Sequence, residues 1–239
     1  MQVNKDGNGY TFAFSIILVI VVGVILSSLS LGLKDRKDAN VAVKKKMNIL
    51  SALGVESTRK DGSEKYDQYI KDSYVISHTG VLQENLPEEK QAFNLDVQKQ
   101  FRDKTIKVAD RLYPIFEAEK DGEKLFVLPV VGKGLWGPIW GFVALADDYE
   151  TIVGTSFDHK GETPGLGAEI SQSFFENRYN GEKIAIDGTF TPITVVQNGT
   201  GSETQKVDGI TGGTITSKGV ERMVNETMEV YYKYFSKNK

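Results

Sequence analysis

The sequence of 239 residues contains no cysteine and only two histidines, His78 and His159. Without cysteine the chain cannot form disulfides, ligate an iron–sulfur cluster through thiolates or build a cysteine-rich zinc site. A multi-histidine metal centre would have to use both histidines. A redox function must therefore use an organic cofactor or a metal held by oxygen ligands, and we predict no metal site.

An excess of charge of one sign is also missing, because 29 basic residues stand against 32 acidic ones. This balance excludes a basic nucleic-acid-binding protein and a disordered acidic chain as descriptions of the whole molecule, and we predict no nucleic-acid partner. The length leaves room for one globular domain with an appendage.

Charge is absent altogether from Tyr10 to Leu33, a segment rich in Ile, Val, Leu and Phe. As a helix it would reach roughly 36 Å, enough to cross a hydrocarbon core of about 30 Å. A buried core helix would usually carry polar positions, and a signal peptide has a shorter apolar region, although Ser27–Ser30 could pass for a cleavage site. We predict a transmembrane helix at residues 10–33 after a short tail, residues 1–9.

Basic residues follow this segment, and by the positive-inside rule alone they would place the large domain in the cytoplasm. They are Lys34, Arg36, Lys37 and Lys44–Lys46, against Asp35 and Asp38. The apolar spacing from about Ala39 to Leu53 predicts a membrane-proximal helix ended by Gly54, within a helix-and-linker segment at residues 34–60.

The rest of the chain, residues 61–239, is expected to form one domain. Strands are predicted at Tyr74–Ser77, Lys124–Val131, Trp140–Leu145, Thr151–Phe157 and Thr191–Val196, and helices at Tyr66–Ile70, Ala168–Phe175 and Ser217–Phe235, with a loop at Thr58–Lys65. Pro129 suggests that its strand has an edge or a bulge. Consecutive strands with short turns predict an α+β protein, with a single N-terminal transmembrane helix followed by one mixed α/β domain.

Three glycine-rich segments carry candidate chemistry, and the first is Thr211–Thr214 (TGGT). A glycine pair most often marks a turn, and on local chemistry alone a turn is a sufficient explanation of this segment. Gly212 and Gly213 also let the backbone approach a bulky group closely. The start of the following helix could receive a phosphate, with Thr216 or Ser217 as its cap and Lys218 as a nearby positive charge.

The second segment is Gly161–Gly167 (GETPGLG), in which the proline and glycines suit a turn between a strand and a helix. Glu162 and Thr163, beside an exposed Leu166, resemble the rim of a binding site with polar groups and one apolar face. Such a rim would suit a flat aromatic ring with polar edges.

The third segment is Gly132–Gly141 (GKGLWGPIWG). Trp140 is expected in the core of a strand, whereas Trp136 lies between glycines and could be either a core residue or a ligand wall. The glycine spacing is not a dinucleotide fingerprint. His159 lacks a serine elbow and is expected to be a surface or hydrogen-bonding residue, so hydrolase chemistry has no support.

In order and spacing these segments resemble the C subunit of the sodium-translocating NADH:quinone reductase, over essentially the whole chain. The matching stretches are the N-terminal span, Asn48–Gly54, Gly132–Gly137, Trp140–Leu145, Gly161–Gly167 and Asp208–Thr214. The flavin-attachment motif of such proteins usually reads Asp-x-x-Ser/Thr-Gly-Ala-Thr, and here Gly213 replaces the alanine.

The resemblance implies an FMN joined through its phosphate to Thr214, attached from FAD by a separate Mg²⁺-dependent flavin transferase that recognises Asp208, Thr211 and Gly212. It also places Trp136, Glu162, Thr163, Leu166 and Gly167 near the flavin. From residue type, Trp136 and Leu166 are expected to contact the ring, Glu162 and Thr163 its polar edge or ribityl chain, and Thr216 and Lys218 the phosphate. Thr214 would be a tether, and no catalytic residue is predicted.

The resemblance further implies a single-electron relay in the bacterial inner membrane, from an iron–sulfur centre in a partner to a flavin in a neighbouring membrane subunit, with export of sodium coupled to it. Other subunits would oxidise NADH. The family's flavin domain lies outside the cytoplasm, against the charge count, and Lys44–Lys46 would then decorate an external helix. Three alternatives are the equivalent subunit of the ferredoxin:NAD⁺ reductase complex, a membrane-bound enzyme acting alone, and a non-redox scaffold.

Overall fold

The computed structural model describes residues 8–197, 199–201 and 203–238. The chain divides into two compact units, Met1–Lys44 and Lys45–Lys239. In the first unit, α1 (Asn8–Gly32) is long and apolar enough to cross a membrane. The helix predicted at residues 10–33 is thus confirmed and begins slightly earlier, while residues 1–7 of the predicted tail lie outside the described residues.

The next helix, α2 (Lys34–Ala52), ends where the sequence predicts. Gly54 has a φ of +67°, which glycine adopts without the steric cost that a side chain would add. The amide of Gly54 donates to the carbonyl of Ser51, and the amide of Val55 donates to that of Leu50, each at 2.9 Å. These bonds satisfy carbonyls that the end of a helix leaves open.

Lys45, one of the three lysines predicted to lie on an external helix, is half-buried. Its Nζ donates to the carbonyl oxygen of Phe93 at 2.5 Å and lies 5.0 Å from the centroid of the Phe93 ring. Burial lowers the pKa of this ammonium group from 10.5 to about 8. The lysine therefore helps to fix the segment around Phe93 against the end of α2.

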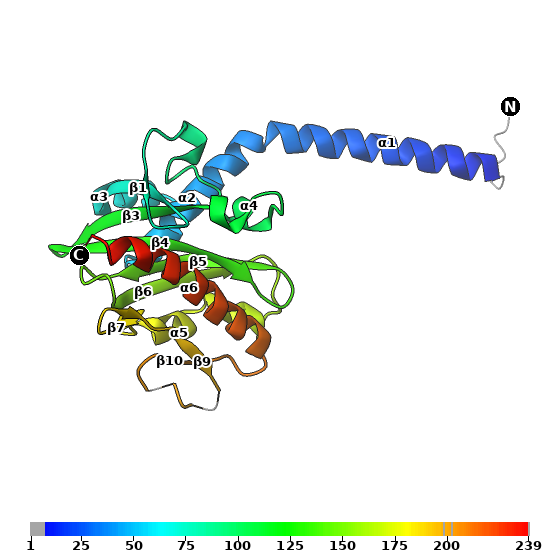
Figure 1. Ribbon diagram of the computed structural model, residues 1–239. Helices are drawn as coiled ribbons and strands as arrows, with labels where there is room; N and C mark the ends of the chain where they lie inside the picture. Colours follow the sequence, from blue (N-terminus) through cyan, green and yellow to red (C-terminus); the bar gives the residue numbers. More distant parts are fainter. Residues whose placement is uncertain (1–7, 198, 202, 239) are drawn as a thin grey trace. The chain divides into compact units, whose positions relative to one another are not determined.

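The second unit is built on a six-stranded antiparallel sheet of order β2-β1-β3-β4-β5-β6 (Figure 1). Its strands are β1 (Ile70–Ser77), β2 (Leu82–Gln83), β3 (Leu112–Lys120), β4 (Glu123–Lys133), β5 (Pro138–Leu145) and β6 (Ile152–His159). Strands β3 to β6 form a meander, whereas β3 pairs with β1 rather than with β2. An antiparallel sheet with helices on its faces is the α+β arrangement that the sequence predicted.

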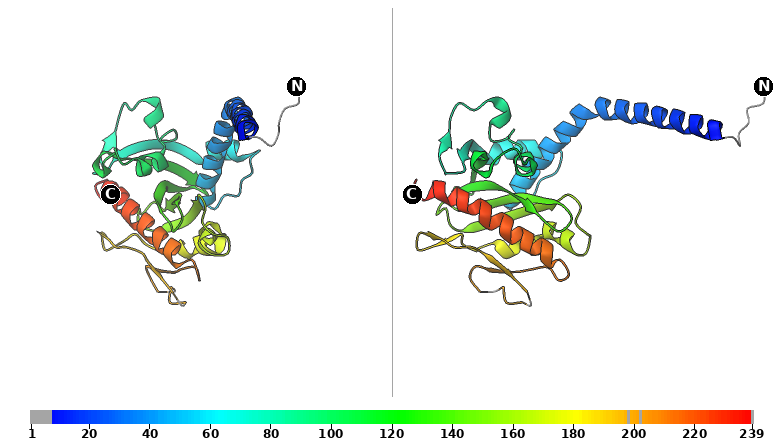
Figure 2. Two further views of the ribbon diagram at one scale, coloured as in Figure 1. Left: turned by 90° about the vertical axis from the view of Figure 1, so that its right-hand side faces the viewer. Right: turned by 45° about the vertical axis from the view of Figure 1, so that its right-hand side comes forward.

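Each face of the sheet is covered by a helix, because both sets of alternating side chains on the central strands are apolar. The face of Phe126, Leu128 and Val130 packs against α6 (Thr214–Phe235), which lies across the sheet in both views of Figure 2. The face of Leu125 and Val127 belongs to a second cluster with Ile49 and Leu50 from the end of α2. The core therefore has two layers, one on each side of the sheet.

Pro129 does not mark an edge strand, because β4 lies between β3 and β5. The pairing of β3 with β4 ends at Val127, so no strand on that side requires an N–H from Pro129, which pairs only with Phe142 of β5. The Tyr231 hydroxyl lies 2.9 Å from the Pro114 carbonyl and 3.2 Å from the Pro129 carbonyl. The hydroxyl of Tyr231 thus bonds the Pro114 and Pro129 carbonyls where the backbone pairing of β3 with β4 has ended.

Three further predictions need correction. The helix expected at Ala168–Phe175 is wrong: η3 (Gly167–Ser171) and α5 (Ser173–Glu176) are separated by an extended Gln172. The strand expected at Thr191–Val196 is shorter and forms only β9 (Thr194–Val196). The loop expected at Thr58–Lys65 ends before Gly62, because α3 (Gly62–Tyr69) begins at that residue. The remaining elements are η1 (Glu88–Lys90), α4 (Val97–Arg102), η2 (Val108–Asp110), η4 (Asn177–Tyr179), β7 (Ala185–Ile186), β8 (Thr189–Phe190) and β10 (Lys206–Asp208).

Candidate functional site

Thr214 is the first residue of α6, and its side chain is exposed. The prediction that α6 begins near Ser217 is wrong. Gly212 has a φ of +75°, and the Gly213 amide donates to the Ile210 carbonyl at 2.9 Å, so the turn closes immediately before Thr214. Gly213 is the N-cap, and among the described residues no side chain caps the helix. The amide groups of the first turn are therefore left without a side-chain cap.

The two other hydroxyl residues of this turn point inward, so the prediction that one of them caps the helix is wrong. Thr216 is 1 % exposed, and its hydroxyl donates to Glu162 Oε2 at 2.6 Å. Ser217 is equally buried, and its Oγ accepts a hydrogen bond from the Ile210 amide at 3.0 Å. Thr214 is thus the hydroxyl of the first turn that solvent and a partner can reach.

Glu162 lies beneath this turn rather than on an exposed rim, since the residue is only 4 % exposed. Its Oε1 accepts a hydrogen bond from the Trp136 amide at 2.8 Å, and its Oε2 accepts the bond from Thr216. The Glu162 amide donates to His159 Nδ1 at 3.1 Å, which confirms His159 as a hydrogen-bonding residue. Glu162 therefore links the loop after β4, the loop after β6 and the start of α6.

Two glycines make room for the Glu162 carboxylate. A Cβ added at Gly134 would lie 2.6 Å from Glu162 Oε1, and one added at Gly167 would lie 2.6 Å from Oε2 and 2.5 Å from the Thr216 hydroxyl oxygen. These separations are shorter than van der Waals contact allows. The glycines of the two loops, which the sequence alone indicates as turn residues, thus serve close packing around one buried carboxylate.

Large apolar side chains remain exposed around this linkage. Trp136 is 70 % exposed, Leu166 42 % and Ile215 55 %, whereas Trp140 is half-buried on β5. Leu166 lies against the Gly212 turn, because a Cβ at Gly212 would lie 2.6 Å from its Cδ2 atom. Exposed aromatic and aliphatic groups beside an accessible hydroxyl are typical of a surface that receives a ligand.

The polar residues of the predicted site take various places. Thr163 is exposed, and its carbonyl accepts bonds from the Leu166 and Ala168 amides. Thr211 is exposed in the turn. Asp208, at the end of β10, accepts a hydrogen bond from the Gly201 amide at 3.2 Å through its carboxylate. The Asp208 carbonyl accepts one from Arg178 at 2.6 Å, a contact for which the sequence carried no signal.

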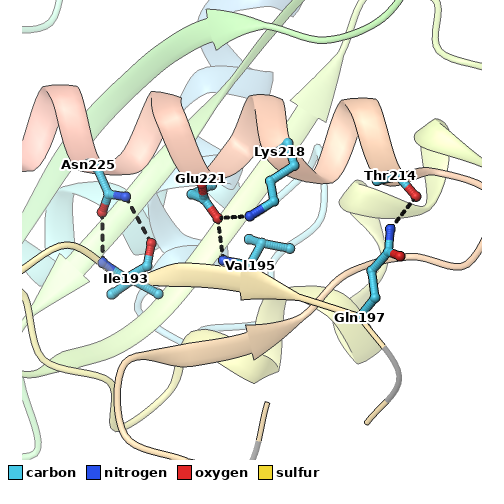
Figure 3. A network of polar contacts seen from close by, with 7 residues as sticks. All are labelled: Ile193, Val195, Gln197, Thr214, Lys218, Glu221 and Asn225. Atoms are coloured by element: carbon cyan, nitrogen blue, oxygen red, sulfur yellow. Dashed lines mark hydrogen bonds and ion pairs between the residues drawn. The ribbon is translucent and has the colours of Figure 1, made fainter. Parts of the chain in front are cut away.

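Gln197 was also missed by sequence reasoning, although it contacts Thr214 directly. Its Nε2 donates to Thr214 Oγ1 at 2.6 Å (Figure 3). Lys218, predicted beside the phosphate, forms an ion pair with Glu221 at 2.7 Å, and the same carboxylate oxygen accepts the Val195 amide. No local motif marks Gln197, because it reaches Thr214 from the end of β9 across 17 positions of the chain.

A separate cavity of about 410 Å³ lies along the C-terminal half of α6, lined by residues such as Arg111, Tyr113, Pro129, Glu226 and Val230. Thr214 is at the other end of that helix. The cavity is therefore distinct from the glycine-rich site.

Comparison with known proteins assigns a class to this site. Residues 134–229 match the family described as FMN-binding domain, a stretch that includes Trp136, Glu162 and Thr214. The protein is thus an FMN-binding domain protein with an apolar N-terminal helix. More particularly, the chain belongs to the family of the C subunit of the Na⁺-translocating NADH-quinone reductase, an oxidoreductase complex, as the relatives below show.

The C subunit from Vibrio parahaemolyticus is 31 % identical, over 92 % of this chain and 90 % of its own length. The one from Haemophilus ducreyi is 28 % identical, over 91 % and 88 %. A solved structure of the C subunit from Parabacteroides distasonis has 36 % identity and a TM-score of 0.75, covering 84 % of this chain and 96 % of that one. The fold and the family predicted from the sequence are both confirmed.

Proposed function

We propose that this chain carries FMN through a phosphoester between the flavin phosphate and Thr214. The observation that carries the proposal is the orientation of the three hydroxyl residues in the first turn of α6. Thr216 and Ser217 are buried and engaged inside the protein, and Thr214 alone of the three is exposed. An anion on its side chain would lie at the positive end of a 22-residue helix.

The surroundings fit the rest of an FMN molecule. The exposed faces of Trp136 and Leu166 suit the flat ring, and Thr163 offers a polar group beside Leu166. Glu162 and Thr216 use their side-chain oxygens within the protein, so we assign them the role of holding these loops in place. Lys218 adds positive charge near the phosphate, although Glu221 shares it.

Maturation would require a partner that recognises the turn before α6. We propose that a flavin transferase recognises Asp208, Thr211 and Gly212 and transfers FMN from FAD. Thr211 and Gly212 are exposed, and the left-handed conformation of Gly212 presents the turn beside Thr214. This accessibility is what a modifying enzyme needs.

Within the complex we propose a relay of single electrons from an iron–sulfur centre in one subunit to a flavin in a neighbouring membrane subunit, with export of sodium coupled to it. FMN supplies the one-electron chemistry, and the protein supplies its position. Covalent attachment would retain a flavin that must stay exposed to partners. The relatives described above all carry the name of the sodium-translocating enzyme, which favours this complex over ferredoxin:NAD⁺ reductase.

We further propose that α1 spans the bacterial inner membrane and that the flavin domain lies on the periplasmic side. The apolar length of α1 supports the first point, and family resemblance supports the second against the basic residues that follow α1. Protease added to intact spheroplasts should digest the domain. Full protection, with digestion only after lysis, would contradict the external placement.

The attachment is tested by expressing the full chain with the transferase and viewing a denaturing gel under ultraviolet light. Wild type and Thr214→Ser should give a fluorescent band, because both carry a hydroxyl, and Thr214→Ala should give none. Thr189→Ala, which changes an exposed threonine elsewhere, is the matched control and should stay fluorescent. A fluorescent band that persists in Thr214→Ala would contradict the assignment of Thr214 as the attachment residue.

A further inference from the structure

The chain segment that leads to Gln197 is fixed on α6 by side chains of the helix. Asn225 accepts from the Ile193 amide at 2.9 Å and donates to the Ile193 carbonyl at 2.8 Å. Two residues further along, Glu221 accepts from the Val195 amide at 2.5 Å. Figure 3 shows these contacts in a row along one side of α6, with the Gln197–Thr214 contact at its end.

This row determines which residue reaches the acceptor threonine. Successive residues of an extended segment point to opposite sides, so fixing Ile193 and Val195 on α6 brings Gln197 to the same side. Val195 is buried and Gln197 is exposed, as expected where the strand leaves the core and passes the end of the helix. The contacts of Ile193 and Val195 with α6 thus bring the Gln197 side-chain amide to Thr214.

We infer that Gln197 is a positioning residue for flavin attachment, and this inference rests on the proposed phosphoester at Thr214. In that step a bond forms between Thr214 Oγ1 and the phosphorus on the FMN side of FAD. The phosphoanhydride bond breaks, AMP leaves, and the hydroxyl proton passes to a base of the transferase.

The direction of the hydrogen bond gives Gln197 its effect. Its Nε2 donates to Thr214 Oγ1, so the proton of the hydroxyl stays available for removal, and the negative charge that develops on the oxygen is stabilised by a neutral donor. The contact also selects one rotamer of a side chain that solvent would otherwise leave free. Both effects should change the rate of phosphoryl transfer within the complex of chain and transferase more than the formation of that complex.

The experiment uses the purified full chain in detergent, with FAD, Mg²⁺ and the transferase, and measures initial rates of flavinylation from in-gel fluorescence as the chain concentration varies. Gln197→Ala and Gln197→Asn, which is one methylene shorter, should lower kcat about tenfold, as expected for loss of a hydrogen bond to a developing charge. KM for the chain should change much less. Gln91→Ala, which shortens an exposed glutamine far from Thr214 in the sequence, is the matched control and should keep the wild-type rate.

The outcomes separate this inference from the proposed attachment. Wild-type rates in both Gln197 variants would overturn the role of Gln197 while Thr214 remains the acceptor. An equal loss in Gln91→Ala would also overturn it, because it would indicate an effect that is not specific to Gln197. A loss confined to KM would overturn it as well, because it would indicate an effect on recognition by the transferase. No flavinylation of the wild-type chain, with a known acceptor protein modified in parallel, would instead contradict the phosphoester at Thr214.

Discussion

The Thr216 hydroxyl donates a 2.6 Å hydrogen bond to Glu162 Oε2, and both residues are almost completely buried. The contact joins the first turn of α6 to the Gly161–Gly167 loop, 54 positions earlier in the chain. Through its second oxygen Glu162 also holds the amide of Trp136. One carboxylate thus sets the relative positions of Trp136, Leu166 and Thr214, the residues we propose to hold FMN.

Replacing Glu162 by alanine should destabilise the domain. The variant leaves the Trp136 amide and the Thr216 hydroxyl without their acceptor, at a cost of roughly 1–3 kcal/mol for each buried group. Glu162→Gln keeps an acceptor and should be milder. Glu169→Ala, which removes a bond to the Gly165 amide in the same loop, is the control. Urea unfolding of the full chain would measure the effect, and equal stability of Glu162→Ala and wild type would refute a central role for this carboxylate.

Gly212→Ala should reduce both stability and flavin attachment. Gly212 has a φ of +75°, where an alanine costs about 1–2 kcal/mol, and its Cβ would push Leu166 aside. Gly161→Ala is the matched control, because that position has no heavy atom within 4 Å of the added Cβ. The fluorescent band at limiting transferase should weaken in Gly212→Ala only. Normal attachment in this variant would show that the turn tolerates another backbone conformation.

Four strands of the sheet, β1, β4, β5 and β6, and the apolar N-terminal helix could be predicted because their patterns are local, whereas β2 and β3 were not predicted. The start of α6 could not be, because Thr214, Thr216 and Ser217 are residues of weak helix propensity whose place is fixed by tertiary contacts with Glu162 and Ile210. The helix predicted at Ala168–Phe175 fails for a similar reason: its apolar spacing reports burial, which two short helical turns provide equally well.

Among the candidate site residues, those carried by a local motif could likewise be predicted, and those placed by tertiary contacts could not. Thr214 was recognisable because a motif of consecutive residues carries it. Gln197 was not, because its contact depends on how Asn225 and Glu221 fix the preceding segment. Glu162 was selected from the sequence as a flavin contact, but its buried orientation could not be predicted, because it follows from Gly134 and Gly167, which leave space only in the folded state.

Lys45 should make the stability of the domain rise with pH between about 8 and 10.5. Burial lowers its folded-state pKa to about 8, while the unfolded chain keeps a value near 10.5, so in this range the unfolded state binds more protons. The free energy of unfolding then increases by at most about 1.4 kcal/mol per pH unit. Lys45→Met should remove this slope, whereas Lys71→Met, at an exposed lysine, should keep it. Parallel pH profiles of wild type and Lys45→Met in urea unfolding would contradict the burial of the ammonium group.

Trp136 should quench the emission of the attached flavin. Its side chain is exposed, and its amide is held by Glu162 at the site, so the indole can lie against a flat ring bound through Thr214. In Trp136→Ala the native flavin fluorescence should rise, while emission from the denatured chain, where no ring contact survives, should equal that of wild type. Trp140→Phe is the control, because Trp140 is half-buried on β5 and should affect stability rather than quenching. If the ratio of native to denatured emission is the same in Trp136→Ala and wild type, the indole does not contact the flavin.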